Sequence, residues 1–191
     1  VCAVYTDHSI LSSLLPERAT KEIWGENPEA TISAGYHPTG KAERINQSWQ
    51  LSGKWGWVSG CDFADWYLFG AFASENDADL IHNFFLVPKT DVRIKDNWHV
   101  MGMRGTGSKN VMIKDATVPD YRVISLPEAN GGAIARGNKE NRPLYRLGHV
   151  SAVPFVFVSV AIGIAESLLR IMTKQISERH SMGRNLSELQ S

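Results

Sequence analysis

The sequence predicts an α+β fold in which a middle β-domain, an antiparallel barrel or sandwich, is flanked by helical segments. Apolar residues recur at helical spacing near both ends of the chain. Between them, short β-branched and aromatic runs are separated by Gly, Pro, Asn and Asp, which is typical of strands joined by turns. A Gly- and Asn-rich segment, 130–141, then separates the strand-rich stretch from the second helical pattern.

The first helical segment covers residues 1–27, which we expect to be the end of an N-terminal helical domain. The pattern runs from Ser9 to Ile23, and Pro16 opens a second helical turn. Gly25 to Pro28 ends it. The apolar stripe of the first part consists of Ile10, Leu11, Leu14 and Leu15.

The strand-rich stretch covers residues 28–128, the expected middle β-domain. Each expected strand is a short run bounded by turn-forming residues. The six runs are Ala30–Ala34, Trp49–Ser52, Trp55–Ser59, Trp66–Ala73, Phe84–Val87 and Asn110–Ile113.

The remaining residues predict a linker loop, 129–143, and the start of a C-terminal helical bundle, 144–191. The apolar run Ser151–Ala165 contains Pro154 and Gly163 and is shorter than the roughly 20 residues that a membrane span needs. It predicts a buried bundle helix and no membrane segment. The chain begins Val-Cys-Ala and stops within a helical pattern, so we expect it to be part of a longer protein.

Charge and composition exclude several function classes. The 20 basic and 20 acidic residues balance without long runs, so no nucleic-acid footprint is expected. The two cysteines are far apart, which argues against a disulfide framework and favours the cytoplasm. The six histidines lack metal-ligand spacing, so no metal site is predicted. There is no Gly-x-Ser-x-Gly motif for hydrolysis.

Two tryptophans are noteworthy for their setting. Trp55 and Trp57 alternate along an expected strand that leads into Ser59-Gly60, and alternation would place both rings on one face. Such rings can wall a planar cofactor or fill a core, and periodicity alone favours the core. The glycine-rich segment Gly102–Ser108 fits neither phosphate-binding fingerprint and predicts a tight turn between strands.

Three motifs carry a family resemblance: Leu51–Trp66, Asn97–Val111 and Ala116–Pro119. In order and spacing they resemble the middle domain of acyl-CoA dehydrogenases and of their flavin monooxygenase relatives. Within that superfamily, Gly102–Lys109 and Pro143–Leu147 resemble the oxygenase components of two-component phenol hydroxylases. The resemblance implies an incomplete acyl-CoA dehydrogenase-like fold.

The resemblance also implies an activity. Such enzymes are flavoprotein oxidoreductases that take reduced flavin, FMNH2 or FADH2, from a separate NAD(P)H-flavin reductase. They react with O2 to form a C4a-hydroperoxyflavin and hydroxylate a small aromatic, phenolic substrate. The resemblance also implies a homotetramer, and no nucleic-acid partner is expected.

Carried over by position, the resemblance assigns site residues. Trp57-Val58-Ser59 would lie along the flavin ring, with Ser59 near N5 as a catalytic residue, and Ala34-Gly35-Tyr36 would form a second flavin contact. Position 34 is a serine in the relatives, so Ser33 is the neighbouring hydroxyl expected to contact substrate. His8 would polarise the phenol. Arg179 would bind the flavin phosphate of a neighbouring subunit. A further catalytic histidine of the relatives falls outside this chain.

Two other functions stay open at this level. An acyl-CoA dehydrogenase would oxidise an acyl thioester with FAD and needs a carboxylate base. One subfamily places that base near the position of Val153, where residues 151–165 contain no acid, but other subfamilies place it beyond Ser191. A binding or assembly protein with the same fold is the third possibility. The joint presence of four residues argues against it: His8, Trp57, Ser59 and Arg179.

Overall fold

The structure is a computed structural model that describes residues 2–74, 80–131, 147–178, 180–181 and 184–185. The chain divides into two compact units, residues 1–153 and 154–191. The predicted domain boundaries stay a prediction, and most of the expected linker, 132–143, lies outside the described residues.

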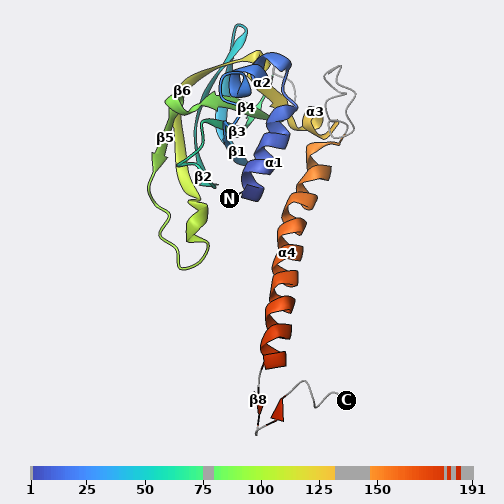
Figure 1. Ribbon diagram of the computed structural model, residues 1–191. Helices are drawn as coiled ribbons and strands as arrows, with labels where there is room; N and C mark the ends of the chain where they lie inside the picture. The colour runs from blue at the N-terminus through green and yellow to red at the C-terminus, as the bar shows by residue number, and fades with distance from the viewer. Residues whose placement is uncertain (1, 75–79, 132–146, 179, 182–183, 186–191) are drawn as a thin grey trace. The chain divides into compact units, whose positions relative to one another are not determined.

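Two helices precede the sheet: α1, Cys2–Ser13, and α2, Glu17–Trp24. Pro16 is the N-cap residue of α2 and makes no side-chain capping hydrogen bond. Both helices lie on one side of the sheet (Figure 1), and their apolar faces are buried there against the strands. The shared cluster includes Leu11, Leu14, Leu15, Ala19 and Ile23 from the helices and Ile32, Leu68, Phe84 and Leu86 from the strands.

The described strands of the first unit form one seven-stranded sheet in the order β5-β6-β2-β1-β3-β4-β7. β1 pairs with β3 in parallel, and the other pairs are antiparallel. The predicted antiparallel barrel or sandwich is therefore corrected to a mixed, open sheet within an α+β fold. The strands are β1 Ile32–Ile45, β2 Ser48–Val58, β3 Trp66–Ala73, β4 Ile81–Pro88, β5 Val92–Lys95, β6 Lys109–Pro119 and β7 Val123–Ser125.

The parallel pair arises from the connection between β2 and β3. β1 and β2 form an antiparallel hairpin, and residues 59–65 then lead the chain to the other edge of β1. Thr31, just before β1, holds this connection: its backbone N–H donates to the Asp65 carboxylate at 2.9 Å, and its hydroxyl donates to the Phe63 carbonyl at 2.9 Å. A strand added there after a reversal must run parallel to β1.

Trp55 fills the core on one face of the sheet. Its ring is 1% exposed and stacks on Phe69 with ring centroids 4.3 Å apart, and its Nε1 donates to the Gly70 carbonyl at 2.8 Å. A Cβ at Gly40 or Gly53 would overlap this ring. These two glycines therefore make room for the tryptophan.

Trp57 does not share that face, so the prediction of two rings on one side of the strand is wrong. The pairing of β2 with β6 shifts between Trp55 and Val58, so β2 holds one extra residue there. Trp57 has a left-handed backbone with φ of 55°. This bulge turns Val58 into the core at 0% exposure and leaves the Trp57 ring 74% exposed.

Helix α4, His149–Glu178, has 30 residues and so measures about 45 Å. It begins in the first unit, and from Pro154 onward it belongs to the second. Its length and apolar composition would allow a membrane crossing, a test that the core helix of a soluble protein passes as well. The helix is thus longer than the apolar run from which we predicted no span, and the absence of a membrane segment stays a prediction. The second unit also holds the short pair β8, His180–Ser181, and β9, Arg184–Asn185.

The two tryptophans should respond oppositely to substitution. Trp55→Ala would empty a packed site and lower the free energy of unfolding by about 3–5 kcal/mol. Trp57→Gly would remove an exposed ring and relieve a left-handed backbone, so it should change that free energy by less than about 1 kcal/mol. Urea denaturation of the two variants checks this, and comparable losses in both would contradict the bulge.

Candidate functional site

The two predicted flavin-contacting segments meet where β1 begins and β2 ends. The Ser33 hydroxyl donates to the Ser59 carbonyl at 2.7 Å. Ser33 and Val58 are fully buried and Ala34 is 5% exposed, so their side chains belong to the core. The accessible side chains of these segments are the exposed Trp57 and the half-buried Tyr36 and Ser59.

The Ser59 hydroxyl begins a chain of hydrogen bonds that sequence reasoning missed. Its Oγ lies 2.7 Å from Ser108 Oγ, which lies 2.7 Å from Thr106 Oγ1. The Thr106 hydroxyl donates in turn to the Met103 carbonyl at 3.0 Å. The signal was present in the Gly-Thr-Gly-Ser motif, which we interpreted only as a turn.

The loop that carries this chain is not a tight turn. It connects β5 to β6 through residues 96–108 and contains a short 3-10 helix, Arg104–Thr106. Met103 and Gly107, on either side of that helix, are left-handed, with φ of 54° and 53°. The Gly60 N–H donates to the Thr106 carbonyl at 2.8 Å and joins this loop to the 59–65 connection.

His8 lies on α1 and is 4% exposed. Its Nδ1 lies 3.0 Å from the Ile32 carbonyl, which can only accept, so Nδ1 carries the proton. Burial lowers the pKa of His8 from 6.5 to about 4, against the opposing effects of this hydrogen bond and of Asp7. The imidazole is therefore neutral at pH 7, with Nε2 as an acceptor.

A second buried polar group surrounds Tyr36. The Tyr36 hydroxyl donates to Asp7 Oδ2 at 2.7 Å, and His149 Nε2 lies 3.0 Å from Asp7 Oδ1. Burial raises the pKa of Asp7, but the hydrogen bonds from His149 and Tyr36 bring it below its usual value. Burial, with Asp7 nearby, raises the pKa of Tyr36. Sequence reasoning missed Asp7 and His149, which are 142 residues apart.

The predicted site residues are thus brought together in part. Ser33, Ala34, Gly35, Val58 and Ser59 meet at one end of the sheet. Tyr36 contacts His8 edge to face, with ring centroids 5.4 Å apart. Arg179 lies outside the described residues. The assigned roles of all these residues stay predictions.

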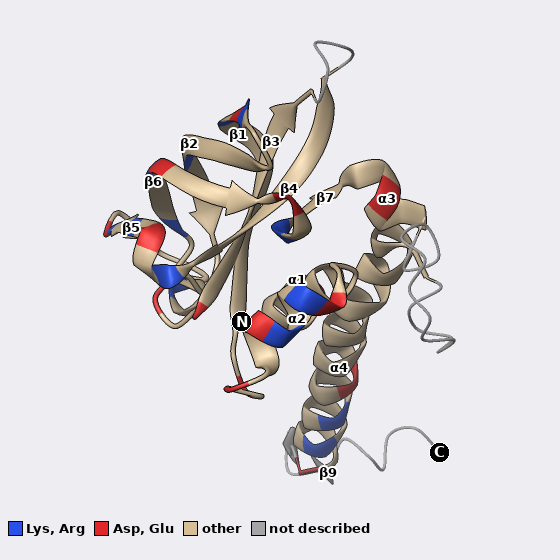
Figure 2. Ribbon diagram, turned by 90° about the horizontal axis from the view of Figure 1, so that it is seen from above, with Lys and Arg blue, Asp and Glu red and all other residues tan. Residues whose placement is uncertain are grey.

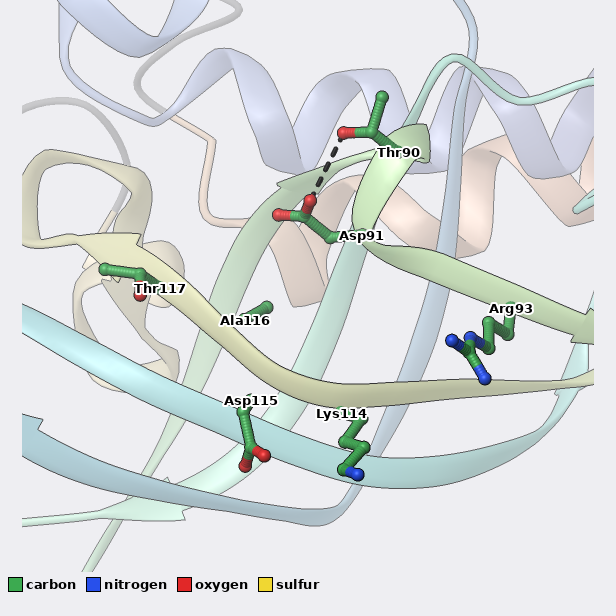
Figure 3. A pocket seen from close by; sticks show the side chains of 7 residues that line it. All are labelled: Thr90, Asp91, Arg93, Lys114, Asp115, Ala116 and Thr117. Carbon is green, nitrogen blue, oxygen red and sulfur yellow. Dashed lines mark hydrogen bonds between the residues drawn. The ribbon is translucent and has the colours of Figure 1, made fainter.

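A hollow elsewhere on the sheet contains none of these residues. Its volume is about 510 Å³, and it is lined by Thr90 and Asp91 before β5, Arg93 on β5, and Lys114, Asp115, Ala116 and Thr117 on β6. Figure 3 shows its charged and hydroxyl side chains, with Thr90 hydrogen-bonded to Asp91.

Acidic and basic residues are interspersed over the first unit, and the first half of α4 has none (Figure 2).

Comparison with known proteins supplies the context for this geometry. No family model matches the chain. The chain is 31% identical over 185 residues to the oxygenase component of the FADH(2)-dependent resorcinol hydroxylase of Rhizobium sp. (strain MTP-10005), covering 96% of this chain and 45% of that protein. It is 31% identical over 165 residues to HsaA of Mycobacterium tuberculosis (strain ATCC 25618 / H37Rv), the oxygenase subunit of a flavin-dependent monooxygenase, covering 86% and 42%.

The chain is homologous to the oxygenase components of flavin-dependent monooxygenases. Solved structures agree. The crystal structure of HsaA from M. tuberculosis matches 76% of this chain and 38% of that one, with a TM-score of 0.71 and 32% identity. XiaF from Streptomyces sp., in complex with FADH2 and glycerol, matches 95% and 46%, with a TM-score of 0.79 and 26% identity. The chain spans less than half the length of these proteins.

The buried, neutral His8 predicts a pH dependence of stability. The unfolded chain binds a proton at a pKa of 6.5 and the folded chain only at about 4, so stability is lost as the pH falls through this window. The loss from this group is about 3 kcal/mol. His8→Gln should flatten the slope of unfolding free energy against pH between 6.5 and 4, measured by urea denaturation.

His99→Gln is the matched control, because His99 is exposed in the loop before β6. That variant should keep the slope of the unsubstituted protein. Equal slopes in the His8→Gln variant and the unsubstituted protein would contradict a neutral, buried His8.

Proposed function

We propose that the protein is the oxygenase component of a two-component flavin-dependent monooxygenase that hydroxylates a phenolic substrate. The observation that carries the proposal is the Ser59 hydroxyl, held by Ser108 two residues after the exposed Trp57, in a chain homologous to such oxygenases. His8 supports it, because a neutral imidazole with an acceptor nitrogen suits a phenol hydroxyl.

The residues present fit one side of a flavin ring. An isoalloxazine offers a broad apolar face and a polar edge at N5, and Trp57 and Ser59 provide an exposed aromatic ring and a hydroxyl two residues apart. When bound, reduced flavin supplies the electrons and activates the oxygen. The protein's part is to hold the ring, orient the substrate and keep water from the reacting atoms.

His8 and Ser59 are each hydrogen-bonded to one of two adjacent residues of β1. The Ile32 carbonyl accepts from His8, and the hydroxyl of the next residue, Ser33, donates to the Ser59 carbonyl. Since consecutive Cα atoms are about 3.8 Å apart, His8 and Ser59 are anchored to one short piece of β1. A rigid strand therefore sets both the predicted phenol contact and the predicted flavin contact.

The partners follow from the same proposal. A separate reductase would supply FMNH2 or FADH2, and the resorcinol hydroxylase relative is itself FADH2-dependent. A small aromatic substrate, a homotetramer with Arg179 at a neighbour's flavin, and a cytoplasmic location are parts of the proposal. The names of the relatives support hydroxylation over acyl-CoA oxidation.

Replacing Ser59 tests the proposal directly. Ser59→Ala in the full-length protein should lower the ratio of hydroxylated product to hydrogen peroxide about tenfold, the effect of one lost hydrogen bond at the reacting edge. The measurement compares product formed with peroxide released after reduced flavin, oxygen and a phenol such as resorcinol are mixed.

Ser52→Ala is the control from the same strand, because the Ser52 hydroxyl bonds to Asp115 at 2.8 Å instead of to the site. The Ser52→Ala variant should give the same ratio of hydroxylated product to hydrogen peroxide as the unsubstituted protein. Normal coupling in the Ser59→Ala variant would remove Ser59 from the reaction, and failure of the unsubstituted protein to bind reduced flavin would refute the proposed function.

A further inference from the structure

The hydroxyls of Ser59, Ser108 and Thr106 form a linear chain with a defined end. Each neighbouring pair of oxygens is 2.7 Å apart, and the chain ends at the Met103 carbonyl. Ser108 is only 7% exposed. Its hydroxyl therefore has Ser59 and Thr106 as its partners in the described part of the protein.

The carbonyl end sets the direction of the chain. A carbonyl only accepts, and a hydroxyl has a single proton to donate. The Thr106 hydroxyl donates to the Met103 carbonyl at 3.0 Å, the shortest of three donations to that oxygen, the others being from Thr106 N at 3.1 Å and Trp98 Nε1 at 3.3 Å. Thr106 then accepts from Ser108, and Ser108 accepts from Ser59.

We propose that Ser108 and Thr106 are positioning residues that hold the Ser59 proton inward, so that Ser59 presents only a lone pair to the flavin. This inference rests on the proposed function and deepens it. The two residues determine whether the Ser59 hydroxyl acts as a hydrogen-bond acceptor or as a donor at the flavin edge. The Ser59 contact alone does not determine this.

The choice matters because N5 of a flavin changes its hydrogen-bonding character with oxidation state. Reduced flavin bears a hydrogen on N5 and donates there, whereas oxidised flavin has a lone pair on N5 and accepts. An acceptor-only Ser59 matches the reduced form and opposes a lone pair of the oxidised form. An oxygenase component that receives reduced flavin from a reductase needs this preference.

The surroundings hold this loop independently of the three hydroxyls. The Gly60 N–H donates to the Thr106 carbonyl at 2.8 Å. Lys109 Nζ is 3.0 Å from Asp62 Oδ1 and 3.2 Å from Asp96 Oδ1. Removing one hydroxyl should therefore leave the loop in place while freeing the proton of Ser59.

The experiment measures the dissociation constants of reduced and oxidised FAD for the full-length protein, the reduced form under anaerobic conditions. The unsubstituted protein should bind the reduced form more tightly. In the Ser108→Ala variant, Ser59 can turn its proton toward N5, so the preference for reduced FAD should fall about tenfold, the size of one hydrogen bond.

Two substitutions at Thr106 keep the test independent of Ser108. Thr106→Val removes the acceptor for Ser108 and should reduce the preference for reduced FAD as Ser108→Ala does. Thr106→Ser keeps a hydroxyl and should show the preference of the unsubstituted protein. Ser52→Ala, outside the chain, should bind both forms as the unsubstituted protein does. Thermal unfolding of each variant confirms that the comparison is made between folded proteins.

An unchanged preference in both Ser108→Ala and Thr106→Val would overturn the inference, and so would an increased preference, which would mean that the chain runs in the other direction. Absence of binding of both reduced FAD and reduced FMN by the unsubstituted protein would overturn the proposed function instead. Binding of reduced flavin by the unsubstituted protein is therefore measured first, before any variant is made.

Discussion

The passage of residues 59–65 from β2 across to the far edge of β1 is the constraint on which the rest of the first unit depends. It makes β3 parallel to β1 and places both apolar faces of β3 in the core. The contacts from Thr31 to Phe63 and Asp65 fix where the passage lies. Its first residue, Ser59, is thereby held next to β1 on one side and next to the 96–108 loop on the other.

The bulge at Trp57 lies at the end of β2, just before this passage. Regular alternation from Trp49 and Leu51 through Trp55 would put position 57 in the core and position 58 outside. One extra residue reverses this, so Val58 is buried and Trp57 is exposed. The left-handed backbone of Trp57 costs about 1 kcal/mol. Backbone strain and an exposed aromatic ring at one position are both expected of a binding site and neither improves packing.

The sequence predicted much of this arrangement but not its connections. The helical pattern that began at Ser9 found α2 and the end of α1, and a β-branched and aromatic run matched the whole of β3. The motif match proposed Ser59, whose role stays a prediction. Strand pairing depends on partners far apart in the chain, so local patterns could not reveal that β1 and β3 run parallel, and β5 and β7 were too short to stand out. Trp49–Ser52 and Trp55–Ser59 appeared as two strands because Gly53 interrupts what is one strand, and that glycine is needed to admit the Trp55 ring.

The candidate site was less predictable for the same reason. Ser59 reaches Ser108 across 49 residues and Asp7 reaches His149 across 142, and neither pair has a spacing that a motif could contain. His8 was found only through resemblance, because an isolated histidine in a helical pattern carries no signal of its own. Its tautomer and charge depend on the Ile32 carbonyl and on burial, which only the fold provides.

Asp7 and His8 are adjacent on α1 but make different hydrogen bonds. Successive positions on a helix differ by about 100°. Asp7 therefore hydrogen-bonds to Tyr36 and His149, while His8 hydrogen-bonds to the Ile32 carbonyl. Asp7 already accepts from two donors, and its attraction for a proton on His8 is weaker than the effect of burial. His8 therefore stays neutral beside a carboxylate. An imidazole kept as an acceptor, and anchored one residue before Ser33, suits the phenol contact that we propose for His8.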